Sequence, residues 1–138
     1  MMVYERIYKA LDGLLPGGVE GFASNSEGYV KLEAGGFMPL SIDLLSVTET
    51  EHGKTIVISM AHNFIQNGDV MADPDMEIRI FTGHKMAEAM TFQQDSLSIY
   101  NQVYQTIDRR EMVNTRLKTE LNSFLATWLR NIKSQGHK

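Results

Sequence analysis

The residues best able to do chemistry lie in one short stretch, HNFIQNGDVMADPDME, which covers residues 62–77. It places a histidine, amides and carboxylates around an Asn-Gly pair. Imidazole nitrogens and carboxylate oxygens are groups that divalent cations accept as ligands. With one further carboxylate downstream, the candidate ligand-binding residues are His62, Asn63, Gln66, Asn67, Asp69, Asp73, Asp75 and Glu88.

The same composition fits a structural role, because Asp and Asn side chains stabilise turns through hydrogen bonds to the backbone. The spacing differs from the Asp-x-Asp-x-Asp-Gly pattern of a calcium-binding loop and from known catalytic zinc motifs. We therefore expect carboxylates that cap the backbone, and a His62 that makes a hydrogen bond at a strand end. We predict no catalytic residue, no metal and no cofactor.

Other catalytic signatures do not occur in the chain. There is no G-x-S-x-G, H-E-x-x-H or P-loop pattern. The sequence contains no cysteine, which excludes disulfides, thiolate nucleophiles and thiolate metal ligands. These absences favour a protein that is not an enzyme.

The strands that flank this stretch indicate how it is positioned. If Asn67-Gly68 were the turn of a simple two-residue hairpin, Ile58 would face Glu77, and an apolar row would lie beside a charged row. A shift of one residue moves all the side chains of a strand to its other face. Pro74 has no N–H to donate, so we place the interruption there and predict a bulged or looped excursion over residues 66–75. One face would then carry Ile56, Ile58, Met60, Met76, Ile78 and Ile80.

The chain is predicted to begin with a helix and to continue as strands, whose apolar residues alternate with polar ones. Apolar residues at helical spacing first predict a helix over residues 3–15, ended by Pro16, and a loose strand or loop follows over residues 19–28. Strands are then predicted over residues 29–32, 38–48, 55–65 and 76–80. Residues 86–93 favour a last strand, with a short helix as the alternative.

Helical spacing returns from about residue 96. Leu97, Tyr100, Val103, Tyr104 and Ile107 would share one helical face, and a second helix would follow a break near Asp108. Its apolar stripe is Leu117, Leu121, Phe124, Leu125, Trp128 and Ile132. We expect this stripe to pack on the sheet.

The fold class predicted from these elements is α+β, with residues 1–138 as a single domain. An antiparallel β-meander of about four to six strands would cover residues 20–93. The N-terminal helix and the C-terminal helices, over about residues 96–134, would pack on one face of it.

Charge is distributed unevenly along the chain. Residues 1–105 carry 6 Lys and Arg against 14 Asp and Glu, whereas residues 106–138 carry 7 against 3. The basic end would either contact nucleic acid or form a helix whose cations favour its own C-terminus. The second interpretation is favoured, because acidic residues are interleaved with the basic ones.

Residues 55–105 resemble an uncharacterised domain family of bacterial, plasmid- and phage-borne proteins. Its approximate pattern is His-Tyr-x-x-Gln-Asn-Gly-Asp-x-Met-x-Asp-Pro-x-Met, then Ala-Glu-(Ala/Ser)-x-Thr-x-Gln-x-Asp. The first part is matched by His62, Gln66, Asn67, Gly68, Asp69, Met71, Asp73, Pro74 and Met76, and the second by Ala87, Glu88, Ala89, Thr91, Gln93 or Gln94, and Asp95. Asn63 stands where the family more often has an aromatic residue. The resemblance implies a mobile-element context, sometimes beside antirestriction or DNA-processing modules. It does not imply a catalytic residue.

We therefore expect a small non-enzymatic accessory or binding domain of a bacterial mobile element. A protein partner or a second copy would bind through the C-terminal helix. One alternative is a metal-dependent or nucleic-acid-processing enzyme centred on residues 62–77, and another is DNA binding through the basic C-terminal helix. The acidic body disfavours nucleic acid, because affinity for DNA depends on neutralising phosphates.

Location follows from the apolar segments. No apolar run approaches the ~18 residues that span a bilayer. The opening MMVYERIYKALDGLL lacks the basic head and uniform apolar core of a signal peptide. We expect a cytoplasmic protein without membrane contact.

Overall fold

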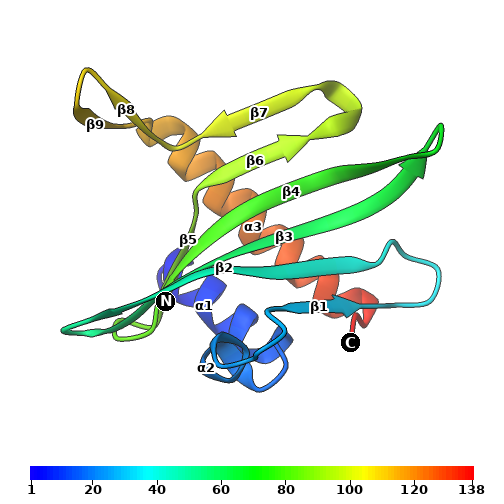
Figure 1. The fold of residues 1–138 in the computed structure, drawn as a ribbon, viewed down its shortest axis with the longest axis horizontal. Coiled ribbons are helices and arrows are strands. Elements are labelled where there is room, and N and C mark those ends of the chain that lie inside the picture. Colours follow the sequence, from blue (N-terminus) through cyan, green and yellow to red (C-terminus); the bar gives the residue numbers. More distant parts are fainter.

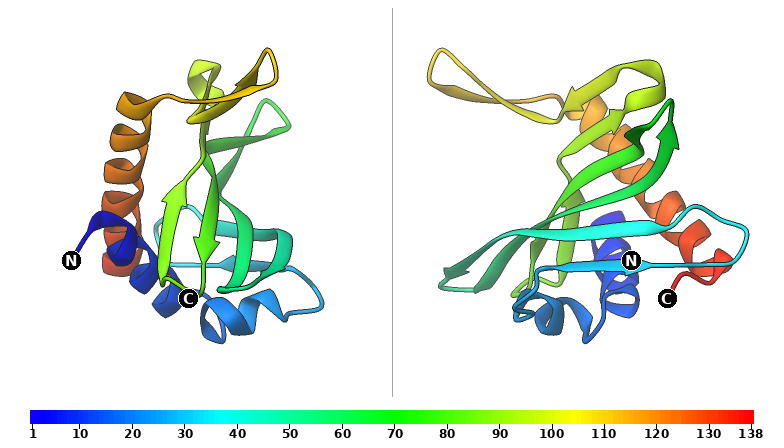
Figure 2. Two further views of the ribbon diagram at one scale, coloured as in Figure 1. Left: turned by 90° about the vertical axis from the view of Figure 1, so that its left-hand side faces the viewer. Right: turned by 45° about the vertical axis from the view of Figure 1, so that its right-hand side comes forward.

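The computed structural model describes residues 1–138, apart from the side chain of Val70. Two helices, α1 (Val3–Leu14) and α3 (Thr115–Gln135), pack on one side of an antiparallel sheet (Figures 1 and 2). A short helix, α2 (Gly18–Ala23), follows α1. The α+β class predicted from the sequence is confirmed. None of the described helices is long and apolar enough to span a membrane.

The main sheet has seven strands. Its order is β1 (Tyr29–Leu32), β2 (Leu40–Thr50), β3 (Gly53–Gln66), β4 (Asp69–Phe81), β6 (Thr91–Gln94) and β7 (Ile99–Gln102). β5 (Met86–Ala89) also pairs with β4, and a short 3₁₀ turn, η1 (Asp95–Leu97), joins β6 to β7. β8 (Tyr104–Ile107) and β9 (Arg110–Val113) form a separate two-stranded arm.

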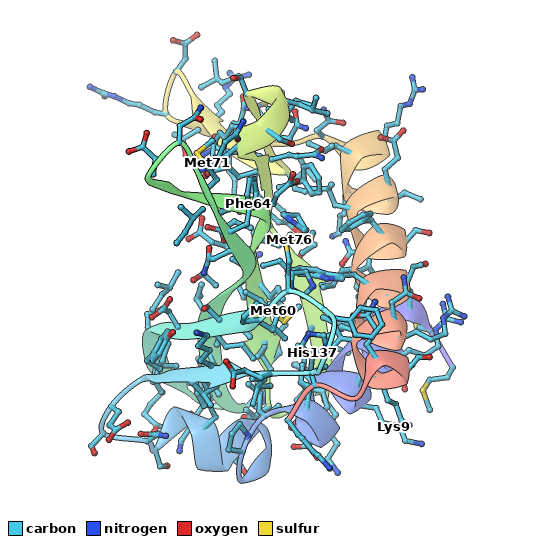
Figure 3. All side chains as sticks on the ribbon, turned by 90° about the vertical axis from the view of Figure 1, so that its right-hand side faces the viewer. Lys9, Met60, Phe64, Met71, Met76 and His137 are labelled. Carbon is cyan, nitrogen blue, oxygen red and sulfur yellow. The ribbon has the colours of Figure 1, made fainter. Side chains whose placement is uncertain are left out.

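The core lies between the sheet and the two long helices. Alternating residues of β2, β3 and β4 are buried on this side, namely Ile42, Ile56, Ile58, Met60, Met76, Ile78 and Ile80. Met60 and Met76 lie opposite each other on neighbouring strands (Figure 3). Ile7 and Leu11 of α1 and Leu125 of α3 close the core from the helical side. Each such side chain stabilises the fold by about 1.5–3 kcal/mol through its removal from water.

The β3–β4 hairpin has the predicted register but a narrower interruption than the predicted one. Asn67 and Gly68 have positive φ angles of 54° and 84°, as a tight two-residue hairpin turn requires. Near the turn, Gln66 pairs with Asp69, whereas Met60 pairs with Met76 further down. The register therefore shifts by one residue, in a bulge opposite His62. The predicted excursion over residues 66–75 was wrong in its extent, because Gln66 and residues 69–72 are paired strand around the two-residue turn.

The C-terminal helix packs as its stripe predicts. Asn114 caps its first turn, accepting a hydrogen bond from the N–H of Leu117 at 3.0 Å. The buried residues of α3 include Leu121, Leu125, Trp128 and Ile132. Phe124, at the edge of the stripe, is 40% exposed and meets Phe92 of β6 edge to face.

Two predicted elements were wrong. Residues 96–113 form no α-helix. They make up the end of η1 and the strands β7, β8 and β9, because the β-branched and aromatic residues here pair across strands. Only Val103 of this segment is buried, anchored where the N–H of Val103 donates to the carbonyl of Met90 at 2.9 Å. The sheet consequently has more strands than predicted, and only one C-terminal helix follows it.

The second correction concerns residues 18–23, predicted as a loose strand or loop. They form α2 because the Asp12 carboxylate accepts a hydrogen bond from the N–H of Val19 at 2.9 Å, and Val19 and Phe22 both bury their side chains. Residues 86–93, in contrast, are β-structure as predicted, but they are divided at Met90 into β5 and β6, and further strands follow them.

Candidate functional site

The predicted site residues at the tip of the β3–β4 hairpin are exposed to solvent. Gln66, Asn67 and Asp69 are exposed and line a depression of about 320 Å³ together with Asp95 and Ser96. Asp95 uses both carboxylate oxygens, accepting from the Nε2–H of Gln93 and the backbone N–H of Ala72, each at 2.7 Å. These two hydrogen bonds hold the pKa of Asp95 below its ordinary value. Asp95 therefore holds the turn after β6 against β4.

Asp73 takes part in the same junction. Its Oδ2 accepts a hydrogen bond from the hydroxyl of Ser96 at 2.6 Å. A carboxylate in this position joins β4 to η1, across 23 residues of sequence. This hydrogen bond gives Asp73 a structural role.

His62 lies elsewhere, on the helical side of the sheet. Its Nδ1–H donates to the carbonyl of Pro39 at 3.1 Å, and its ring meets Trp128 edge to face at 5.4 Å. The imidazole of His137 lies 5.6 Å away and donates through Nε2–H to the carbonyl of Met38 at 2.9 Å. Burial lowers the pKa of His62, and the nearby His137 adds to this effect.

Asn63 and Asp75 lie on the other side of the sheet. The Nδ2–H of Asn63 donates to the hydroxyl of Ser41 at 3.1 Å. Burial raises the pKa of Asp75, and the carboxylates of Glu77, Asp95 and Asp43 raise it further. Several carboxylates therefore lie close together on the side of the sheet that faces away from the helices.

Glu88 belongs to a fourth location, a buried junction of β4, β5, β8 and α3. Its Oε2 accepts from the Nη2–H of Arg79 at 3.0 Å, and its Oε1 accepts from the hydroxyl of Tyr104. The ammonium of Lys118 lies 3.8 Å from the same Oε1. Both cations also lie over the Tyr104 ring, at 5.0 and 5.5 Å from its centre. Glu88 thereby attaches the base of the arm to the body.

The eight predicted residues are therefore not brought together into one site. In the part of the chain that the structure describes, no group of three His, Asp or Glu side chains could hold a metal ion. The enzyme alternative centred on residues 62–77 needs His62, Asp69 and Asp73 to converge. His62 instead contacts Trp128 and His137, while Asp73 bonds Ser96.

A second concavity lies between α1 and α3, where the sequence predicted no site. It is a groove of about 1020 Å³. Its floor is apolar or small, with Val3, Ala10 and Leu14 from α1 and Ala126 and Leu129 from α3.

The walls of this groove are also built from small residues. Gly13 of α1 and Ser123 of α3 are exposed in it, and a Cβ atom added at Gly13 would meet no atom of a neighbouring element within 4 Å. Small residues at these positions leave space open between the two helices.

One sequence signal pointed to this groove without identifying it. Arg6, Lys9 and Gly13 recur at intervals of three and four residues, next to the apolar stripe of α1. Such spacing places them on one side of a helix. It does not show which other element that side meets.

The chain was compared with curated proteins, with solved structures and with models of protein families. Searches of curated proteins and of solved structures find no match to the chain. A family model described as a domain of unknown function, DUF6908, matches residues 2–138. The match runs from α1 through the sheet to α3, and thus includes both walls of the groove. The chain belongs to the DUF6908 family.

Proposed function

We propose that this protein is a non-enzymatic binding domain and that the groove between α1 and α3 receives a segment of a partner protein. The observation that supports the proposal is the combination of an apolar floor with walls of small residues. Binding grooves for peptides are concave and mostly apolar, with polar groups at their margin.

The position of the groove also favours binding over chemistry. Both walls are helices that are fixed to the core by buried residues, such as Leu11 of α1 and Leu125 of α3. A groove between rigid elements keeps its shape before the ligand arrives, which lowers the entropic cost of association. Because the resemblance of residues 55–105 indicates mobile-element proteins, we further propose that the domain serves a bacterial mobile element.

A neutral helical peptide tests this function. A stapled peptide of about 15 residues, roughly 22 Å long, would carry Leu and Ala on one face and Gln on the other. We expect saturable changes in the backbone amide NMR signals of groove residues such as Ala10 and Ala126. Changes spread elsewhere on the surface, or no changes at all, would refute the proposal.

Groove-filling variants supply the specificity control. Gly13→Leu fills the groove from α1 and Ser123→Trp fills it from α3, and both positions are exposed. Asn131→Trp adds the same bulk to an exposed position of α3 that does not line the groove. Peptide binding should be lost in the first two variants and kept in the third, with all three proteins folded by circular dichroism.

A further inference from the structure

The rim of the groove is strongly basic in a protein that is acidic overall. The net charge of the chain is −4. Five of its 13 Lys and Arg residues nevertheless line this groove, and none of its 17 Asp and Glu residues does so among the described side chains. The five are Arg6, Lys9, Arg130, Lys133 and Lys138.

None of these five cations forms an ion pair with another described residue. The ion pairs of the described side chains use other cations, namely Lys31, Arg79, Arg116 and Lys118. Like charges gathered on one surface repel one another, and this repulsion is relieved when an anionic partner binds. The rim therefore favours a negatively charged ligand.

The shape of the groove indicates a helix as the ligand. Small residues, including Ala10, Gly13, Ser123 and Ala126, allow another backbone to approach closely. The 12 residues of α1 extend over about 18 Å, which is the length of three turns of a partner helix. A partner would place its apolar side chains on the floor and its acidic side chains beside the rim.

Two other occupants fit less well. A second copy that used the same face would oppose the basic rim with an identical basic rim, because a two-fold interface pairs a surface with itself. A membrane surface is contacted by protruding apolar side chains. This face is instead concave, with small residues exposed in it, and Met1 is the one strongly exposed apolar side chain among its described lining residues.

We infer that the groove between α1 and α3 binds an acidic amphipathic helix of a partner protein, with its apolar face on Ala10, Leu14 and Ala126 and its carboxylates beside Lys9 and Arg130. This inference rests on the proposed binding function of the groove and specifies the partner class. Electrostatic complementarity of this kind selects among partners and accelerates their association.

The experiment compares three stapled peptides with the same apolar face and with Glu, Gln or Lys on the other face. Fluorescence anisotropy at low salt should show the Glu peptide binding about tenfold more tightly than the Gln peptide, and the Lys peptide more weakly than both. The preference for Glu should shrink as NaCl is raised. If the Gln peptide binds the groove as tightly as the Glu peptide, the binding function stands and the acidic partner class is wrong.

Charge-reversal variants identify the rim as the cause. The double variant Lys9→Glu/Arg130→Glu should lose the preference for the Glu peptide while keeping its affinity for the Gln peptide. The matched control, Arg109→Glu/Arg110→Glu, changes the net charge equally at exposed positions of the arm and should keep the preference.

Two further probes separate the partner classes. Vesicles that contain phosphatidylserine and a short DNA duplex are each titrated into the same proteins. If either binds more tightly than the Glu peptide, and loses affinity with Lys9→Glu/Arg130→Glu, the inference of a helical protein partner is overturned. Tighter binding of the Glu peptide, lost in the Gly13→Leu variant, supports it.

Discussion

The side-chain Oδ1 of Asn122 accepts a hydrogen bond from the backbone N–H of Ala89 at 2.8 Å, where α3 passes β5. Both residues are buried. β5 pairs only with β4 in the sheet, so this N–H has no partner strand. The Nδ2–H of Asn122 donates to the carbonyl of Lys118 at 2.8 Å, which fixes the orientation of the amide. The side chain of Asn122 in α3 thus supplies a hydrogen-bond acceptor for the backbone N–H at the edge of β5.

Replacing Asn122 with Ala should therefore destabilise the protein by about 1–3 kcal/mol, because the N–H of Ala89 would stay buried without an acceptor. Urea unfolding at constant pH measures the effect. Ser123→Ala, at the neighbouring exposed position, should change the free energy of unfolding by less than about 0.5 kcal/mol. Equal effects of the two substitutions would show that the hydrogen bond contributes nothing.

The apolar stripe of α3 gives a second prediction. Leu121→Ala should cost about 2–5 kcal/mol, because Leu121 is only 6% exposed and its loss leaves a cavity under the helix. Asn131→Ala, on the exposed side of the same helix, is the control. An unchanged thermal midpoint for Leu121→Ala in the monomer would mean that the stripe serves a partner rather than the core.

Asp75 gives a prediction about pH. Its folded pKa is raised above the ordinary value of 3.8, so the folded state binds more protons and loses stability as pH rises through that folded pKa. Asp75→Asn should therefore raise the thermal midpoint at pH 7, and the gain should disappear near pH 3. Asp69→Asn, at the exposed hairpin tip, should show no such pH-dependent gain. A lower midpoint for Asp75→Asn at pH 7 would contradict the prediction.

His62 has a pH dependence of the opposite sign. Its folded pKa is lowered below 6.5, so its contribution to stability is present above about pH 6.5 and is lost as pH falls through that value toward the folded pKa. The fall in stability between pH 7 and pH 5 should be smaller in His62→Gln than in the parent. His52→Gln, at an exposed turn, should leave the fall unchanged. Parallel curves for the parent and His62→Gln would refute this prediction.

Metal ions should not stabilise the protein. Asp73 is bonded to Ser96 and His62 to Pro39, so binding an ion at residues 62–77 would require these contacts to break. Adding millimolar Mg²⁺, Mn²⁺, Ca²⁺ or Zn²⁺ to chelator-treated protein should leave the thermal midpoint unchanged. A saturable rise with one ion, abolished by Asp73→Asn and by low pH, would instead support the metal-dependent alternative.

The segment from residue 96 to 113 shows why local pattern was insufficient for part of the fold. Tyr100, Val103, Tyr104 and Ile107 recur every three or four residues, which is typical of a helix. Short strands broken by turns can produce the same spacing by coincidence. Pairing of β7 with β6, and the left-handed φ angles of Asp108 and Arg109 between β8 and β9, decide the structure instead.

The amino-acid sequence by itself determined the α+β class, the shifted register of the long hairpin and the buried stripe of α3. Each of these depends on periodicity within one segment, or between two segments joined by a short turn such as Asn67-Gly68. The candidate binding groove was decided only by the tertiary structure. Lys9 and Arg130 stand on helices at opposite ends of the chain, and they line one groove because α1 and α3 both bury their apolar stripes on the same face of the sheet.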